Sequence, residues 1–223
     1  MVNIMEYGSM LGESFAYAKE AVVGKWMQWL LLFIATILLC IPLMGYTVRV
    51  FRGDNPAPEV TDWVTLFIDG IKYLVISLIY AIPSLIILFV TMGSAIIALA
   101  SGRMPEMTAG FEGLIFGMII FIIVAVICGL FGMIGIIRFA RTGSMGEAFN
   151  FPEIKETIQK IGWAPYLGAF IIMFVVQLVV SIVLSLITMI PVIGVLIELV
   201  FVAPVAIFEA RYFAKVYESA GSN

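Results

Sequence analysis

The chain has 223 residues, of which 63% are hydrophobic and 12% are charged, and its net charge is −3. A soluble domain carries about a quarter charged residues, so this composition excludes an ordinary soluble domain and predicts an integral membrane protein. The chain has no histidine and no basic run, which disfavours acid–base catalysis and leaves nucleic-acid binding without support.

Long uncharged runs between the few charged residues predict the membrane-spanning helices. About 20 apolar helical residues cross a bilayer core about 30 Å thick. Five apolar segments are long enough: residues 26–47, 73–100, 113–137, 163–190 and 195–213. Pro191 and Gly194 predict the turn between the last two segments, and Pro83 predicts a kink in the second. The sequence therefore predicts one all-α integral membrane domain over residues 1–223.

Two connecting segments have the periodicity of amphipathic helices at the membrane surface. In residues 62–72 polar side chains, Asp69 among them, recur at steps of three and four opposite an apolar face. The alternative is that these residues form the first turns of the second apolar helix. In residues 144–161, Ser144 and Glu147 have the spacing of a capping box at a helix start.

A short motif occurs twice. Residues 8–15 (GSMLGESF) resemble residues 143–149 (GSMGEAF), and each copy precedes a mixed-charge segment that leads to Trp26 or Trp163. This similarity predicts an internal duplication of an interfacial helix followed by a spanning helix. Chance similarity within a biased composition is the alternative.

Two arginine pairs with the same spacing follow the first and third apolar segments. They are Arg49 with Arg52, and Arg138 with Arg141. A basic residue near an anionic leaflet gains about 1 kcal/mol. We expect all four to contact lipid headgroups on the cytoplasmic side, or to pair with acids of neighbouring interfacial helices.

Five polar residues within the apolar segments form a candidate intramembrane site. Gln177, Ser181, Ser185 and Thr188 recur at near-helical spacing in the fourth segment, and Glu198 is the one ionisable residue well inside the fifth. An ionised carboxylate at that depth costs at least about 2.5 kcal/mol, so we expect Glu198 to face the bundle interior. The polar stripe either lines a pathway or holds helices together.

The distribution of lysine and arginine predicts the topology. With five spans, nine basic residues lie on the side of the C-terminus, and Lys19, Lys25 and Arg103 lie on the other. The positive-inside rule then places the C-terminus in the cytoplasm and the N-terminus outside. If residues 41–45 form a re-entrant turn, the count becomes eleven against one, with both termini inside. We favour five spans, because the return leg before Arg49 is short.

Several of these stretches together resemble a known family. They are residues 45–53 (GYTVRVFRG), 62–72 (DWVTLFIDGIK), 79–83 (IYAIP) and 138–149 (RFARTGSMGEAF). The sequence resembles an uncharacterised prokaryotic membrane-protein family, domain-of-unknown-function family 4013, which is frequent in methanogenic archaea. The resemblance covers nearly the whole chain. It implies a multi-pass membrane protein and brings no activity or site residues with it.

The sequence favours a function without catalysis. Phosphate loops, metal-ligand clusters and nucleophile motifs are missing, so we expect no catalytic residue, cofactor or metal site. Cys40 and Cys128 lie in apolar segments and are expected to behave as small hydrophobes. We expect a cell-membrane scaffold or accessory subunit that binds lipids, other membrane proteins or a second copy of itself. The alternative is a small transporter or channel that acts as an oligomer.

Overall fold

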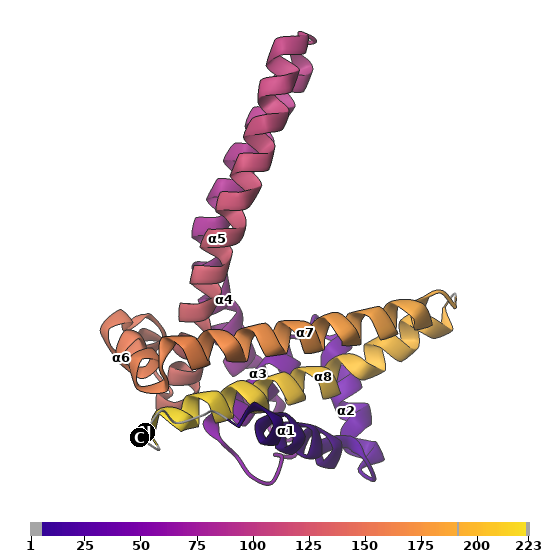
Figure 1. Ribbon diagram of the computed structural model, residues 1–223. Coiled ribbons are helices and arrows are strands. Elements are labelled where there is room, and N and C mark those ends of the chain that lie inside the picture. The colour runs from indigo at the N-terminus through magenta and orange to yellow at the C-terminus, as the bar shows by residue number, and fades with distance from the viewer. Residues whose placement is uncertain (1–5, 191, 222–223) are drawn as a thin grey trace. The chain divides into compact units, whose positions relative to one another are not determined.

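The computed structural model describes residues 6–190 and 192–221, and the secondary structure in this part is helical (Figure 1). The α-helices are α1 (Tyr7–Val22), α2 (Trp26–Ile37), α3 (Ile41–Arg52), α4 (Trp63–Ala100), α5 (Met104–Thr142), α6 (Phe151–Ile161), α7 (Trp163–Thr188) and α8 (Ile193–Glu218). Two short 3₁₀ helices, η1 (Met145–Phe149) and η2 (Ser219–Gly221), complete the set. The predicted all-α class is confirmed. Pro191, predicted to form the last turn, lies outside the described residues.

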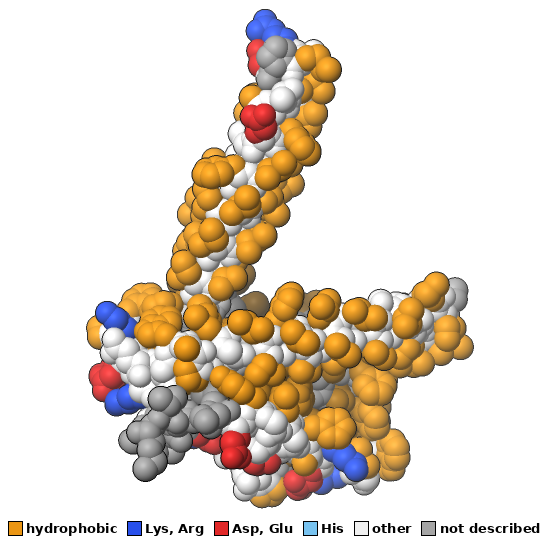
Figure 2. Space-filling view, in the orientation of Figure 1, with side chains coloured by type: hydrophobic (Ala, Val, Ile, Leu, Met, Phe, Trp, Pro, Cys, Tyr) orange, Lys and Arg blue, Asp and Glu red, His pale blue; other side chains and the backbone are white. Residues whose placement is uncertain are grey.

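Four helices are long and apolar enough to cross a membrane. These are α4, α5, α7 and α8, with 38, 39, 26 and 26 residues, each above the roughly 20 that one crossing needs. At most 22% of the most apolar window of each is buried, so their surfaces are left for lipid or other proteins. Hydrophobic side chains are frequent along the visible parts of these helices (Figure 2). A fifth span is counted only if the bent pair α1 and α2 is taken as one.

The first apolar segment is not one helix. Helix α2 ends at Ile37, and Leu39 and Cys40 have positive φ angles of 56° and 58° before α3 starts. Residues with side chains rarely adopt this left-handed conformation, and two in succession end a helix. The prediction of a single span over residues 26–47 is therefore wrong.

Helix α3 brings the chain back to the level of α1. The Tyr17 hydroxyl donates to the Asp54 carbonyl oxygen (2.7 Å), and the Gln28 amide nitrogen donates to the Pro58 carbonyl oxygen (3.1 Å). The residues that follow α3 thus lie beside the second half of α1 and the first turn of α2. This chain path fits the re-entrant alternative, with the turn at residues 38–40 instead of residues 41–45, and re-entry into the membrane stays a prediction.

The N-terminal helix lies against the end of α8. Glu13 of α1 forms an ion pair with Lys215 of α8, and the Arg211 guanidinium lies 4.9 Å from the Tyr17 ring centroid. A topology with the N-terminus outside and the C-terminus inside would separate these partners by a bilayer. The contact between α1 and the end of α8 argues against that predicted sidedness, and the orientation of the chain in the membrane stays a prediction.

Helix α4 has no separate interfacial segment before it. Residues 63–72 are its first turns, and the helix continues through Pro83 to Ala100. The predicted separate amphipathic helix is wrong and the alternative holds. Asp69, expected on a water-facing side, is only 5% exposed. The reason is that α3 packs on this face of α4.

Glycines allow α3 and α4 to cross closely. A Cβ atom on Gly45 would lie 1.9 Å from the Leu66 carbonyl oxygen, and one on Gly70 would lie 1.9 Å from the Ile41 carbonyl oxygen. No side chain fits at such distances, so backbone meets backbone at this crossing.

The two copies of the short motif fold differently. Residues 8–15 lie inside α1, whereas residues 143–149 form a turn and η1. Ser144 makes no side-chain cap, so the predicted capping box is wrong. The Glu147 carboxylate is instead bound to Arg138 and Asn150. The internal duplication stays a prediction.

The chain divides into two compact units. One comprises Met1–Leu74 with Ile134–Asn223, and the other comprises Val75–Met133. The first unit holds the largest buried side chains, among them Tyr46, Tyr166 and Tyr212. The contacts of the candidate site and of the groove described below belong to this first unit.

Candidate functional site

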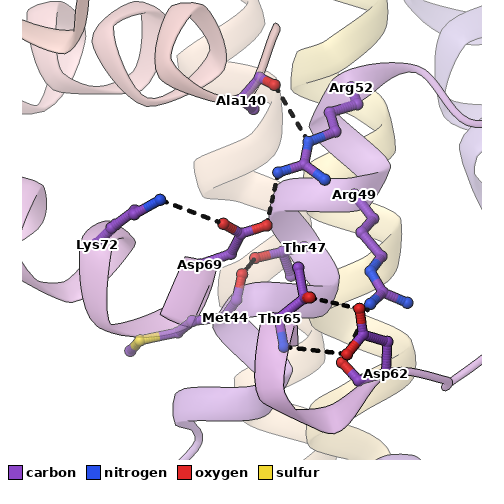
Figure 3. Close-up of polar contacts among 9 residues, drawn as sticks. All are labelled: Met44, Thr47, Arg49, Arg52, Asp62, Thr65, Asp69, Lys72 and Ala140. Atoms are coloured by element: carbon purple, nitrogen blue, oxygen red, sulfur yellow. Dashed lines mark hydrogen bonds and ion pairs between the residues drawn. The ribbon is translucent and has the colours of Figure 1, made fainter. Parts of the chain in front are cut away.

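Helices α3 and α5 end side by side, and an arginine from each caps the other. The Arg52 Nε donates to the Ala140 carbonyl oxygen at 3.3 Å, as Figure 3 shows. The Arg141 Nε donates to the Phe51 carbonyl oxygen at 2.6 Å. The last carbonyl groups of a helix have no donor within the helix and carry partial negative charge. The exchange therefore satisfies both helix ends at once.

Carboxylates hold the same two arginines from the other side. Arg52 Nη2 lies 2.5 Å from Asp69 Oδ2, and Arg141 Nη2 lies 2.5 Å from Glu218 Oε1. Lys72 Nζ lies 3.9 Å from the second Asp69 oxygen (Figure 3). The two contacts at 2.5 Å are charge-assisted hydrogen bonds, which are about twice as strong as hydrogen bonds between neutral groups. We call these six residues, Phe51, Arg52, Asp69, Ala140, Arg141 and Glu218, the arginine cluster.

Arg49 and Arg138 fasten the chain that follows each helix. Arg49 donates to the Asp62 carbonyl oxygen (3.4 Å), which precedes α4 (Figure 3). Arg138 pairs with Glu147, and its Nη1 lies 3.5 Å from Glu153 Oε2 of α6. The hydrogen bond from Arg138, supported by one from Asn150, holds the pKa of Glu147 below its ordinary value.

A glycine makes room for the cluster. Gly53 follows α3 with φ +94°, and a Cβ atom there would lie 2.8 Å from Arg141 Nη1. The positive φ angle favours glycine at this position, and a larger residue would also make the Arg141 guanidinium shift.

The four arginines thus pair mainly within the protein. Acids of other elements bind three of them: Asp69 of α4 binds Arg52, Glu147 of η1 binds Arg138, and Glu218 of α8 binds Arg141. Two of these acids lie in spanning helices and not in the interfacial helices that were expected to supply them. Their side chains are 35% (Arg52), 13% (Arg138) and 28% (Arg141) exposed, so part of each faces outward. Contact with lipid headgroups stays a prediction.

Glu198 and Gln177 are not brought together. The Gln177 amide nitrogen donates to Glu209 Oε2 at 2.7 Å. Glu198 is exposed on α8 and, among the described residues, has no hydrogen-bond or ion-pair partner. The expected inward orientation of Glu198 is therefore not seen among the described residues, where its side chain is exposed.

The three hydroxyl residues of the predicted stripe bind locally or not at all. The Ser185 hydroxyl donates to the Ile182 carbonyl oxygen (2.8 Å), and the Thr188 hydroxyl donates to that of Ser185 (2.9 Å). Ser181 is exposed. Hydroxyls that bind carbonyls of their own helix form no shared pocket in this chain. Their role as a functional site stays a prediction.

Sequence reasoning missed two residues of α8. Glu209 is the partner of Gln177, and Arg211 is 8% exposed against Tyr17, with its Nη1 buried and unbonded within the described chain. Their position in the sequence could have pointed to them. Both residues directly follow the apolar run that ends at Phe208, and both lie inside a helix that continues to Glu218.

Metal ligation has no support in the part of the chain that the structure describes. There, no group of three or more His, Cys, Asp or Glu side chains could hold an ion. Both cysteines are free, and Cys40 donates weakly to the Thr36 carbonyl oxygen (3.4 Å).

The helical fold with its long apolar spans defines an integral membrane protein, and the polar contacts described above tie helix ends together. A family model described as "Protein of unknown function (DUF4013)" matches residues 29–190, and the chain belongs to this family. No curated protein and no solved structure matches the chain.

Proposed function

We propose that the protein is a non-catalytic scaffold or accessory subunit of the cell membrane that binds other membrane proteins or lipid. One observation carries the proposal: the spanning helices leave most of their apolar surface uncovered, while carboxylates of the same chain bind Arg52 and Arg141. A chain that presents such helical faces is suited to binding partners in the bilayer.

Helix α7 offers the clearest binding face. Phe174 is 69% exposed and Leu186 is 63% exposed, although both lie on a helix that packs against α8. These side chains point away from the chain's own core. Such a face is available to a second protein, or to a second copy of this chain.

The proposal includes a topology with both termini in the cytoplasm. If α2 and α3 form a re-entrant hairpin, eleven of the twelve basic residues share one side and Arg103 alone lies on the other. Ser9→Cys and Ser101→Cys, each in a background without Cys40 and Cys128, test this with a membrane-impermeant thiol reagent. We expect labelling in intact cells at position 101 only; labelling at position 9 would contradict the topology. A methanogen as the source, implied by the family resemblance, is also part of the proposal.

Photo-crosslinking in the native membrane tests the scaffold function. A photoreactive amino acid is placed at Phe174, and the matched control places it at Tyr166 of the same helix, which is 0% exposed. We expect one protein adduct of defined mass at position 174 and none at position 166. A preparation that yields no protein adduct and retains a bound small solute would refute the scaffold and favour transport.

Transport is the second candidate, favoured by the Gln177–Glu209 contact. A carboxylate bound to an amide at 2.7 Å inside an apolar hairpin is typical of a site that handles ions or protons. Glu209→Gln keeps the shape and removes the charge. Loss of activity in cells with unchanged thermal stability would support transport, and unchanged activity would count against it.

A further inference from the structure

An apolar groove lies where α1 and α2 meet the α7–α8 hairpin. Its volume is about 310 Å³, and its walls include Phe15, Val22, Val180, Phe201 and Phe208. Of the described residues that line it, Lys19 and Gln177 carry a charge or an amide, and the others are apolar or aromatic. All four helices belong to the same compact unit. The volume lies at the lower end of the range of about 300–1,000 Å³ that is usual for small-molecule sites.

The polar groups inside the groove are already bound within the protein. The Gln177 amide donates to Glu209, and the Trp29 indole nitrogen donates to the Val200 carbonyl oxygen at 3.2 Å. A polar solute would find few free donors or acceptors there. The groove therefore selects hydrocarbon.

One cation remains at the edge of the groove. Lys19 is exposed and, within the described chain, its ammonium forms no ion pair, although Lys215 and Lys160 each hold a carboxylate. Lys19 is thus the free charge that an occupant of the groove would meet, and it favours an anion.

The angle of α1 sets the depth of this charge. Helix α1 meets α2 at 99°, and its Glu13 and Glu20 are exposed. A helix that turns across the start of an apolar one and keeps its acids exposed is typical of the membrane surface. Lys19 then lies at the level of lipid headgroups, with the apolar walls of the groove below it.

The size of the groove decides between a lipid chain and a partner helix. A helix is about 10–12 Å across with its side chains, so it would need a groove as wide as itself between these four helices. A single hydrocarbon chain is much narrower and fits between the apolar side chains that line the groove.

We propose that this groove holds an acyl chain of an anionic phospholipid whose phosphate pairs with Lys19. The inference deepens the lipid-binding part of the proposed function. It fails independently of the scaffold function, because a protein adduct at Phe174 does not depend on the groove.

Trp29 in the groove wall supplies a local probe. With Trp26, Trp63 and Trp163 replaced by Phe, it is the remaining tryptophan. The purified chain is reconstituted in phosphatidylcholine vesicles that contain small fractions of phosphatidylglycerol or phosphatidylcholine with brominated acyl chains, which quench indole fluorescence. We expect the brominated anionic lipid to quench Trp29 at about a fivefold lower mole fraction, the factor that corresponds to one basic residue at an anionic surface.

Matched variants separate the groove from general lipid contact. Lys19→Gln should abolish the preference, whereas Lys25→Gln, exposed and not part of the groove, should keep it. Val180→Phe, which fills the groove, should weaken quenching by both lipids. Equal quenching by the two lipids in the parent, or equal loss in both lysine variants, would overturn the proposal.

Discussion

Removal of the Asp69 carboxylate should destabilise the fold measurably. The side chain of Asp69 is 7% exposed and bound at 2.5 Å to Arg52, whose own side chain is 35% exposed. A hydrogen bond to a charged group contributes about 1.5–3 kcal/mol, and an unpaired buried charge costs more. Because the Arg52 head can partly reach water, we expect Asp69→Ala to lower the free energy of unfolding by about 2 kcal/mol. Denaturation in detergent micelles, followed by tryptophan fluorescence, measures this.

A second ion pair of the chain provides the control. Glu106 lies 3.1 Å from Arg103, but these side chains are 45% and 77% exposed. Exposed pairs contribute about 0–1 kcal/mol, so Glu106→Ala should cost well below half as much as Asp69→Ala. A double-mutant cycle with Arg52→Gln should assign most of the Asp69 effect to this pair. Equal losses in the two alanine variants would refute the reasoning.

Three further outcomes are expected from the same structure. Gly45→Ala should lower thermal stability in detergent by at least about 2 kcal/mol, because its Cβ would overlap the α4 backbone, whereas Gly93→Ala, with open space around it, should not. Arg138 lowers the native pKa of Glu147 below 4.5, so the stability from this ion pair is complete above about pH 4.5 and is lost as the pH falls through the lowered pKa. Glu147→Gln should therefore lose less melting temperature on acidification than the parent protein. An unchanged acid response would contradict this. Tyr46→Phe should lower the free energy of unfolding by about 1 kcal/mol in urea denaturation, because it removes a buried hydroxyl that donates to the Pro58 carbonyl oxygen at 2.8 Å. No change would mean that the Gln28 amide alone satisfies the Pro58 carbonyl oxygen.

The apolar segments after residue 72 could be read from the sequence. Transfer into lipid depends on the local density of apolar and charged residues, and this is a property of each segment by itself. For that reason the predicted segments 113–137, 163–190 and 195–213 correspond to α5, α7 and α8. The equal spacing of the two arginine pairs also indicated equivalent roles: Arg52 and Arg141 each bind the end of the other's helix, and Arg49 and Arg138 each bind the chain that follows their own.

Only the tertiary structure decided how the first segment runs and where the charges go. Residues 26–47 are equally apolar as one span or as a re-entrant hairpin, so composition cannot separate the two; the turn at Leu39 and Cys40 depends on α3 packing against α4. Likewise, Asp69 has the spacing of a surface residue, and it is buried because Arg52 approaches from a helix outside its own local pattern. Periodicity fixes which face of a helix is apolar, but which helix ends meet depends on contacts between residues far apart in the chain.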